Sequence, residues 1–247
     1  MMTTSAGKPM SARAAVRQTA VRVLSRPIAA WEYAFKPELR DPFGGPFNGQ
    51  RGRQAIFNEV VRRLDVQCVI ETGTFRGTTT EFMAEQAPAP IWTIEARPRY
   101  YYYSVMRLRR FSRVHISLGD SRTFLRRLAT SNDVPKSRAF FYLDAHWYED
   151  LPLKDEIEII IRHWSNFAIM IDDFEVPGDA GYKFDDYGNG KRLSLSYLGP
   201  LSLLGLQAFF PSIPSGDETG MRRGSIILTD ADGARSLNGA TTVRAEK

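Results

Sequence analysis

Short runs of β-branched and aromatic residues alternate with longer amphipathic segments from Gln67 onward. This alternation is typical of a parallel sheet whose strands are joined by crossover helices. It predicts five strands, at residues 68–71, 91–95, 114–117, 139–143 and 167–171. Four helices are predicted between them, near residues 78–86, 99–110, 122–129 and 153–164. We therefore expect an α/β fold with helices on both faces of a mostly parallel sheet.

The alternation of strands and helices changes after the fifth strand. A helix is predicted at 193–204, and two strands follow at 206–210 and 225–229 with only a turn-rich segment between them. Two strands without an intervening helix favour an antiparallel hairpin at the sheet edge, which brings the sheet to seven strands. Upstream, the Gly- and Pro-rich residues 41–52 predict a loop that leads into a helix at 53–64. We interpret residues 1–52 as an arm and loop and 53–247 as one domain.

Composition excludes several classes of protein. The 247 residues are 43% hydrophobic and 25% charged, which suits one globular α/β domain with an added arm. The longest apolar runs fall short of the ~18 residues that a membrane-spanning helix needs. A fibrous, disordered or integral membrane protein is therefore excluded. The single cysteine, Cys68, lies beside a Val-Ile run and is interpreted as a small buried hydrophobe. Nothing requires an oxidising compartment, so we expect a cytoplasmic protein.

The net charge of +5 resides in the arm. Residues 1–31 hold five basic side chains and no acid, whereas the remaining residues balance 28 basic against 28 acidic ones. Arginines interrupt the apolar residues of the arm, so it lacks the apolar core of a secretory signal. We expect the arm to pack on its own domain or on a second subunit of a homo-oligomer, or to cover the acceptor. A transit peptide and contact with an anionic membrane surface are the alternatives.

Polar residues follow the strands at the edge where ligands bind in open parallel sheets. The first strand ends in Glu71-Thr72-Gly73 and continues through Phe75 to Gly77-Thr78. Gly73 permits a tight turn, and Gly77 would let the start of the next helix approach a ligand. A dinucleotide-binding fingerprint would need glycine where Glu71 stands. The acid-x-Gly-x-x-x-Gly form instead resembles the first motif of class I S-adenosylmethionine (SAM)-dependent methyltransferases.

The next two strand ends extend this resemblance. Glu95 ends the second strand, 22 residues beyond Gly73, where an acid can accept hydrogen bonds from both ribose hydroxyls of an adenosine. The third strand is followed by Gly119-Asp120-Ser121, which resembles the Gly-Asp pair that contacts adenine in these enzymes. Asp120 is alternatively the N-cap of the following helix. The expected cofactor is SAM, bound by residues 71–73, 77–78, 95 and 120–121.

Three carboxylates are expected to converge where the fourth and fifth strands end. The fourth strand continues into Asp144-Ala145-His146-Trp147-Tyr148, and the fifth ends in Asp172-Asp173. Neighbouring carboxylates repel one another and raise each other's pKa unless a cation lies between them. Oxygen ligands of this number suit Mg²⁺ or Mn²⁺. The alternative is that these acids cap two separate helices.

This arrangement resembles the metal-dependent O-methyltransferases, typified by catechol O-methyltransferase and, in the Asp-Asp ending, by the macrocin O-methyltransferase group that acts on sugar hydroxyls. The resemblance covers residues 66–174. It implies a Rossmann-like sheet, a metal held by Asp144, Asp172 and Asp173, and methylation of a hydroxyl. The catechol enzyme's Asp-His-Trp-Lys is here Asp144-Ala145-His146-Trp147-Tyr148, so its lysine base is absent. His146 is then the candidate base beside Asp144, or a residue that only orients a ligand.

The acceptor is expected to be a small molecule or a saccharide. The glycine-rich loop at 176–187 is a candidate acceptor-binding loop through Tyr182, Lys183 and Tyr187, or an ordinary surface loop. A catechol-type methyltransferase and a non-catalytic adenosine-ligand or interaction module remain alternatives. The Asn/Asp-Pro-Pro-aromatic motif typical of base-methylating enzymes does not follow the fourth strand, which argues against nucleic acid.

Overall fold

The computed structural model describes residues 12–146 and 150–246, so Trp147 and Tyr148 lie outside the described residues. Its sheet has the order β3-β2-β1-β4-β5-β7-β6-β8. The strands are β1 (Cys68–Thr72), β2 (Ile91–Glu95), β3 (Val114–Leu118), β4 (Ser137–Leu143), β5 (Ser165–Asp172), β6 (Gln207–Pro211), β7 (Ser225–Thr229) and β8 (Val243–Ala245). The first five strands pair in parallel, and β7 pairs antiparallel with both β5 and β6. The predicted α/β class is confirmed.

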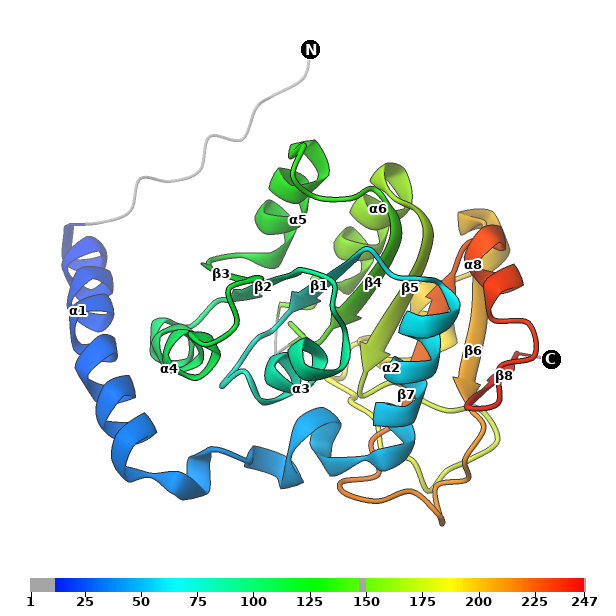
Figure 1. Ribbon diagram of the computed structural model, residues 1–247, viewed down its shortest axis with the longest axis horizontal. Coiled ribbons are helices and arrows are strands. Elements are labelled where there is room, and N and C mark those ends of the chain that lie inside the picture. The colour runs from blue at the N-terminus through cyan, green and yellow to red at the C-terminus, as the bar shows by residue number, and fades with distance from the viewer. Residues whose placement is uncertain (1–11, 147–149, 247) are drawn as a thin grey trace.

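Helices connect the strands and cover both faces of the sheet (Figure 1). They are α1 (Ala12–Phe35), α2 (Arg51–Arg63), α3 (Thr78–Gln86), α4 (Pro98–Leu108), α5 (Ser121–Thr130), α6 (Leu153–His163), α7 (Leu195–Leu198) and α8 (Ala231–Ser236). Four 3₁₀ turns accompany them, η1 (Pro37–Leu39), η2 (Pro42–Gly44), η3 (Pro46–Gly49) and η4 (Leu201–Leu204). None of the helices in the described part of the chain is both long and apolar enough to cross a membrane.

The C-terminal part differs from the sequence-based expectation in three respects. The single helix predicted over 193–204 is instead the short pair α7 and η4, because Gly199, at φ 82°, and Pro200 end the first turn. An eighth strand, β8, pairs antiparallel with β6 and forms the edge of the sheet. Helix α8 precedes β8. Both elements are too short for their hydrophobic pattern to indicate them.

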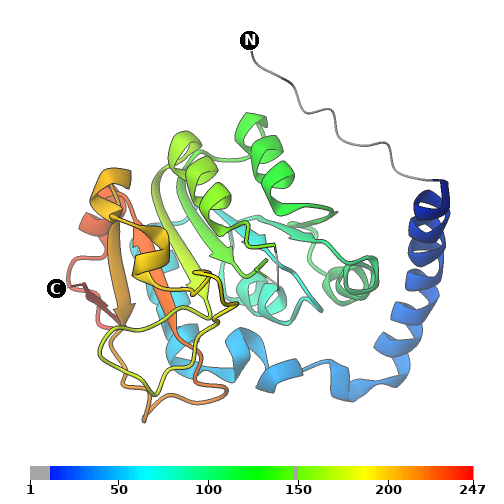
Figure 2. The ribbon, with the colours of Figure 1, turned by 180° about the vertical axis from the view of Figure 1, so that it is seen from behind.

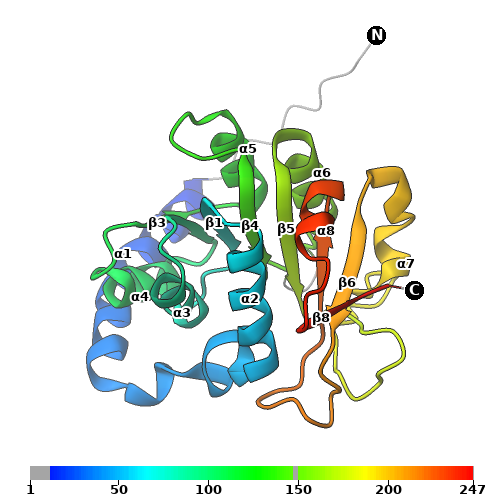
Figure 3. The same ribbon diagram turned by 45° about the vertical axis from the view of Figure 1, so that its right-hand side comes forward.

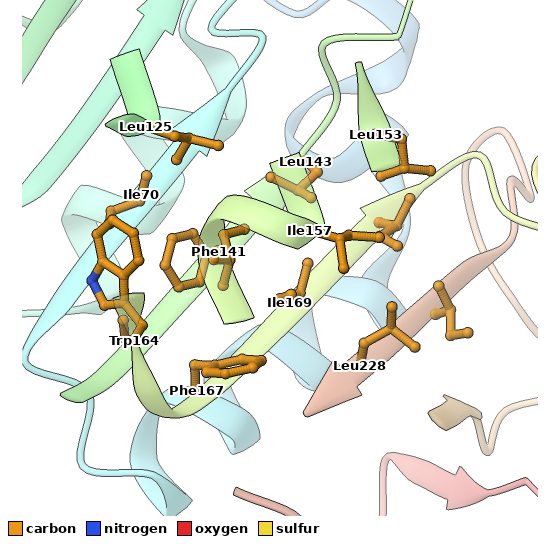
Figure 4. Close-up of a cluster of buried hydrophobic side chains, with 14 of the residues drawn as sticks. Ile70, Leu125, Phe141, Leu143, Leu153, Ile157, Trp164, Phe167, Ile169 and Leu228 are labelled. Atoms are coloured by element: carbon orange, nitrogen blue, oxygen red, sulfur yellow. The ribbon is translucent and has the colours of Figure 1, made fainter. Parts of the chain in front are cut away.

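Alternate residues of each central strand enter opposite halves of the core. In β4, Phe141 packs with the residues of α5 and α6, whereas Phe140 and Tyr142 pack with those of α2 and α3. Figure 4 shows the first half, in which Phe141 lies beside Trp164 and Ile169 lies close to Ile157 of α6. Figure 3 shows α2 and α8 together on the opposite face. Both faces of the sheet are therefore buried, as a parallel sheet requires.

The N-terminal segment runs from α1 along the carboxyl edge of the sheet to α2 (Figures 1 and 2). Helix α1 packs along α4. The turns η1 to η3 follow, and Phe47 anchors them because its fully buried ring lies 5.1 Å from that of Tyr142 and 5.7 Å from that of Phe57. This anchoring brings the predicted arm and loop against the edge where the strand-end residues gather.

Candidate active site

A cavity of about 530 Å³ lies beyond the carboxyl ends of the strands. This volume is in the usual range for small-molecule sites. Each of the first five strands contributes residues from its end or from the loop that follows it. The lining residues predicted from sequence are Glu71, Gly73, Thr78, Glu95, Asp120, Ser121, Asp144, Asp172 and Asp173. The cavity therefore gathers most of the expected cofactor and metal residues.

Glu71 is buried at the end of β1. One carboxylate oxygen accepts hydrogen bonds from the hydroxyls of Thr80 (2.5 Å) and Thr93 (2.6 Å). Burial raises the pKa of Glu71 to about 7, against the effect of these two hydrogen bonds. A positively charged group in the cavity would therefore favour the ionised form of Glu71.

The two glycines of the β1–α3 turn have different surroundings. Gly73 has φ 92°, and a Cβ at this position would overlap the carbonyl oxygen of Asp144, so glycine lets the ends of β1 and β4 meet. Gly77, at φ 74°, would place a Cβ 3.0 Å from Leu108 and 3.3 Å from Ser104. Gly77 thus allows α3 to pack closely on α4, which differs from the predicted approach to a ligand. Thr72 is fully buried and is not among the lining residues of the cavity.

Glu95 is buried at the end of β2. Its carboxylate accepts hydrogen bonds from the backbone N–H groups of Phe75 (2.8 Å) and Arg97 (2.7 Å). Burial raises its pKa, against these hydrogen bonds. The rings of Phe75 and Tyr100 meet at 4.4 Å beside it, and both line the cavity with Phe43 of η2. The ribose-binding candidate therefore lies next to an aromatic surface.

Asp120 is the N-cap of α5, which agrees with the alternative prediction for this residue. Its carboxylate accepts a hydrogen bond from the backbone N–H of Thr123 (3.0 Å) and pairs with Arg122 (2.7 Å). The hydrogen bond from Arg122 lowers the pKa of Asp120 despite partial burial. Asp120 and Ser121 still line the cavity, so capping and ligand contact are compatible.

Both carboxylate oxygens of Asp172 already accept hydrogen bonds from neighbouring donors. One carboxylate oxygen pairs with the buried guanidinium of Arg53 and accepts the backbone N–H of Asp173 (2.7 Å). The other accepts hydrogen bonds from the Tyr142 hydroxyl (2.6 Å) and the Asn48 amide (3.3 Å). Burial raises the pKa of Asp172, but Arg53 and the Tyr142 hydroxyl outweigh it and lower the pKa below its usual value. This geometry argues against Asp172 as a direct metal ligand.

Asp144 and Asp173 both line the cavity. Burial and the charges of Asp172 and Asp173 raise the pKa of Asp144 well above its usual value. Burial and the charge of Asp172 raise the pKa of Asp173 to about 7. The guanidinium of Arg223 lies between Asp173, at 2.6 Å, and Asp185, to which it is also paired. One internal cation thus already neutralises part of this carboxylate cluster.

His146 is buried beside these acids, and neither ring nitrogen has a hydrogen-bond partner among the residues that the structure describes. Burial lowers the pKa of His146. Its ligand atom and those of Asp173 and Asp185 all lie within 4.8 Å of one another. A neutral imidazole and two carboxylates at this spacing fit a divalent cation. The predicted neighbours His146 and Asp173 are therefore brought together, with Asp185 as an addition.

Asp185 of the predicted acceptor loop lines the cavity, whereas the three predicted contacts Tyr182, Lys183 and Tyr187 are not among its lining residues. The Tyr182 side chain is buried and its hydroxyl donates a hydrogen bond to the backbone oxygen of Ile213 (3.0 Å). Lys183 is exposed. The Tyr187 hydroxyl lies 2.5 Å from a carboxylate oxygen of Asp185 and 2.9 Å from the carbonyl oxygen of His146. Tyr187 therefore positions Asp185 and His146 instead of meeting a ligand in this cavity.

Arg53, Asp185 and Arg223 belong to the site although the sequence does not predict them there. Asp185 lies within the glycine-rich loop, and the only local indication that it could be a ligand is its acidic side chain. Arg53 reaches the site from α2, and Arg223 reaches it from the connection between β6 and β7. Neither arginine stands in a motif or at the end of a parallel strand, so only tertiary contact identifies it.

Comparison with known proteins identifies the fold. No protein-family model matches the chain, and no curated protein matches it either. An O-methyltransferase from Bacillus cereus in complex with SAH is 15% identical, with a TM-score of 0.56, and the match covers 87% of this chain and 97% of that chain. Cofactor-bound Rv0187 from MTB is 16% identical, with a TM-score of 0.53 and coverage of 86% and 89%.

A third similar structure is the O-methyltransferase TomG from Streptomyces achromogenes, involved in tomaymycin synthesis, in complex with SAM. It is 13% identical, with a TM-score of 0.51, and the match covers 72% of this chain and 80% of that chain. The chain therefore has the Rossmann-like fold of class I O-methyltransferases.

Proposed function

We propose that the protein is a SAM-dependent O-methyltransferase. The observation that carries this proposal is the cavity, because its lining unites the acid-x-Gly turn of β1 with Glu95 and with the Asp144–Asp173 carboxylates. The similar structures that bind SAM or SAH support the cofactor. SAM, when bound, supplies an electrophilic methyl group on a sulfonium. The positive charge of this cofactor suits the acidic lining.

Different residues of the cavity bind different parts of SAM in this proposal. Glu95 accepts hydrogen bonds from the ribose hydroxyls, since its oxygens retain acceptor capacity beside Phe75 and Arg97. Asp120 and Ser121 contact the adenine. The methionine part lies against the Gly73 turn and Glu71, both of which line the cavity. Thr72, Gly77 and Thr78 hold the turn and the start of α3 in place.

A divalent cation, Mg²⁺ or Mn²⁺, is proposed at the end of β4 and β5. Asp144 and Asp173 remain the sequence-predicted ligands. The ligand atoms of Asp173, His146 and Asp185 lie within 4.8 Å of one another, and Asp172 supports Asp173 by accepting its backbone N–H. Such an ion, when bound, stabilises negative charge that develops on the acceptor oxygen. Because Arg223 pairs with Asp173 and Asp185, a metal ion must compete with this guanidinium.

The acceptor is proposed to be a hydroxyl of a sugar or a glycosylated metabolite. Proton removal from an alkyl hydroxyl needs a base, and His146 is the proposed one when it is not a ligand. Burial lowers the pKa of His146, which favours the neutral imidazole that either role requires. A catechol-type acceptor is the second candidate, favoured by the aromatic lining of Phe43, Phe75 and Tyr100.

A screen with methyl-labelled SAM tests this proposal. Carbohydrate and phenolic acceptors are offered in parallel, with EDTA and then with added Mg²⁺ or Mn²⁺. We expect transfer to a carbohydrate hydroxyl that EDTA abolishes and the metal restores. Binding of SAM without transfer to any acceptor would favour a non-catalytic module. Full activity in EDTA would remove the metal but leave the methyltransferase assignment.

A direct measurement of metal binding tests the proposed ligands without depending on turnover. Mn²⁺ binding, followed by electron paramagnetic resonance, should weaken at least about tenfold in Asp173→Asn and Asp144→Asn. Arg223→Gln should strengthen it, because the competing internal cation is lost. Asp155→Asn, an exposed acid of α6, is the matched control. Equal binding in all four variants would contradict the proposed metal site.

A further inference from the structure

Helix α1 exposes four large apolar side chains on one side. Leu24, Ile28, Trp31 and Phe35 are 60%, 43%, 53% and 69% exposed. Their spacing of four, three and four residues places them in one row along the helix. The rings of Trp31 and Phe35 lie 6.5 Å apart, so the row is continuous at its C-terminal end. We name these four residues the outer row of α1.

Over residues 24–35, the opposite side of α1 carries small or polar side chains and the ring of Tyr33, and it faces α4. Ser25, Ala29 and Glu32 are buried there. Glu32 accepts a hydrogen bond from Arg99 Nε of α4 at 2.9 Å, and the ring of Tyr33 lies edge-on to that of Tyr103 at 5.4 Å. A surface helix of a globular protein normally buries its apolar side and exposes its polar one. Over residues 24–35, the part of α1 whose side chains the structure describes, the helix does the reverse.

The charge of the arm determines what can cover the outer row. The first 31 residues carry five positive charges and no acid. Arg26 is exposed on α1 itself, and the nearby acid Glu32 is paired with Arg99. A second copy of the chain that used the same face would bring two positively charged arms together. An anionic surface instead complements both the apolar row and the charge.

We propose that α1 docks on an anionic lipid surface through the outer row. The helix then lies in the plane of the interface, with Leu24, Ile28 and Phe35 among the acyl chains. Trp31 lies at the headgroup level, where amphipathic aromatic rings are favoured. The proposal is independent of methyl transfer. The docked helix would lie near the cavity, because the chain continues from α1 to η2, whose exposed Phe43 lines the cavity.

Vesicle co-sedimentation of the full chain tests this docking. Vesicles of phosphatidylcholine alone are compared with vesicles that also contain phosphatidylglycerol. We expect binding to the anionic vesicles, weakened by high salt. Binding should fall at least about tenfold in the double variant Leu24→Ser/Phe35→Ser, because two inserted side chains are lost. Leu203→Ser, which removes a leucine that is 83% exposed in η4, is the matched control and should bind as the parent does.

Two further measurements keep the test decisive. Trp31 emission should shift to shorter wavelength on anionic vesicles, and this shift should be absent in Trp31→Phe. Light scattering after size exclusion reports the oligomeric state of the same variants. No binding of the parent chain to anionic vesicles would overturn the proposal. A dimer that dissociates in the double variant, without vesicle binding, would assign the outer row to a second copy instead.

Discussion

Arg53 and Asp172 form an ion pair in the interior, with side chains only 1% and 2% exposed. Arg53 extends from α2, and its guanidinium also donates to the backbone oxygens of Arg223 and Gly224. The pair therefore ties α2 to the end of β5 and to the connection before β7. A buried charge without its partner is costly, so a substitution at Asp172 should lower the free energy of unfolding as well as change the site.

Asp172→Asn should destabilise the fold by about 3–5 kcal/mol, because it leaves the Arg53 guanidinium buried without its counter-charge. Urea unfolding measures this loss directly. Glu158→Gln breaks an exposed pair with Arg162 on α6 and should cost less than ~1 kcal/mol. The double variant Arg53→Met/Asp172→Leu should lose less unfolding free energy than the single variants Arg53→Met and Asp172→Leu lose together. An Asp172→Asn protein as stable as the parent would refute the structural role of this pair.

Glu95→Ala should weaken SAM binding by about tenfold to a hundredfold, since charge-assisted hydrogen bonds to the ribose are lost. The variant also releases the backbone N–H of Phe75, which loosens the turn after β1. Isothermal titration calorimetry with SAH measures the change. Glu85→Ala, an exposed acid of α3 that pairs with Arg110, is the control and should retain full affinity. Unchanged affinity in Glu95→Ala would remove Glu95 from the site.

The strand-end residues were predictable because their positions follow from the alternation of strands and helices. Glu71, Glu95 and Asp144 lie where the first, second and fourth strands end, and all three line the cavity. The partners of these acids were not predictable. Arg53 meets Asp172 across 119 positions of sequence, and Arg223 meets Asp173 across 50. A local pattern identifies an acid at a strand end, but only tertiary packing decides whether it binds a metal or an arginine.

The same reason explains why the two interpretations of the acceptor loop could not be separated from the sequence. A glycine-rich, polar loop fits acceptor contacts through Tyr182, Lys183 and Tyr187 as well as an ordinary surface loop. In the structure, the Tyr182 hydroxyl bonds to Ile213 and the Tyr187 hydroxyl to the site acid Asp185. Composition describes the loop but does not specify which way its rings point.

Glu59 should make stability depend on pH. Its carboxylate accepts hydrogen bonds from the backbone N–H of Thr242 (2.8 Å), the Thr242 hydroxyl (2.7 Å) and Arg63 (2.8 Å). These bonds outweigh burial and lower the pKa of Glu59 from 4.5 to about 2. Because the folded pKa lies below the unfolded value, the stabilisation is complete above pH 4.5 and is lost as the pH falls toward 2.

Glu59→Gln should therefore cost on the order of 2 kcal/mol at neutral pH and progressively less in acid. Unfolding free energies of the variant and the parent, measured over this pH range, give the difference. Glu38→Gln removes an exposed acid of η1 that pairs with Lys36 at 3.6 Å, and its effect should be small at every pH. A difference that stays constant with pH would show that Glu59 contributes packing and not charge.

Gly73→Ala should destabilise the protein by about 2–4 kcal/mol and weaken SAH binding as well. The new Cβ would overlap the Asp144 carbonyl oxygen and lie 2.6 Å from its carbon, and both are backbone atoms that cannot rotate away. The φ of 92° adds strain for any residue with a side chain. Gly216→Ala is the control, because its Cβ meets no atom within 4 Å. Thermal unfolding and calorimetry should detect both losses in Gly73→Ala only. If Gly73→Ala instead matches Gly216→Ala in stability and affinity, the close contact between the ends of β1 and β4 does not shape the site.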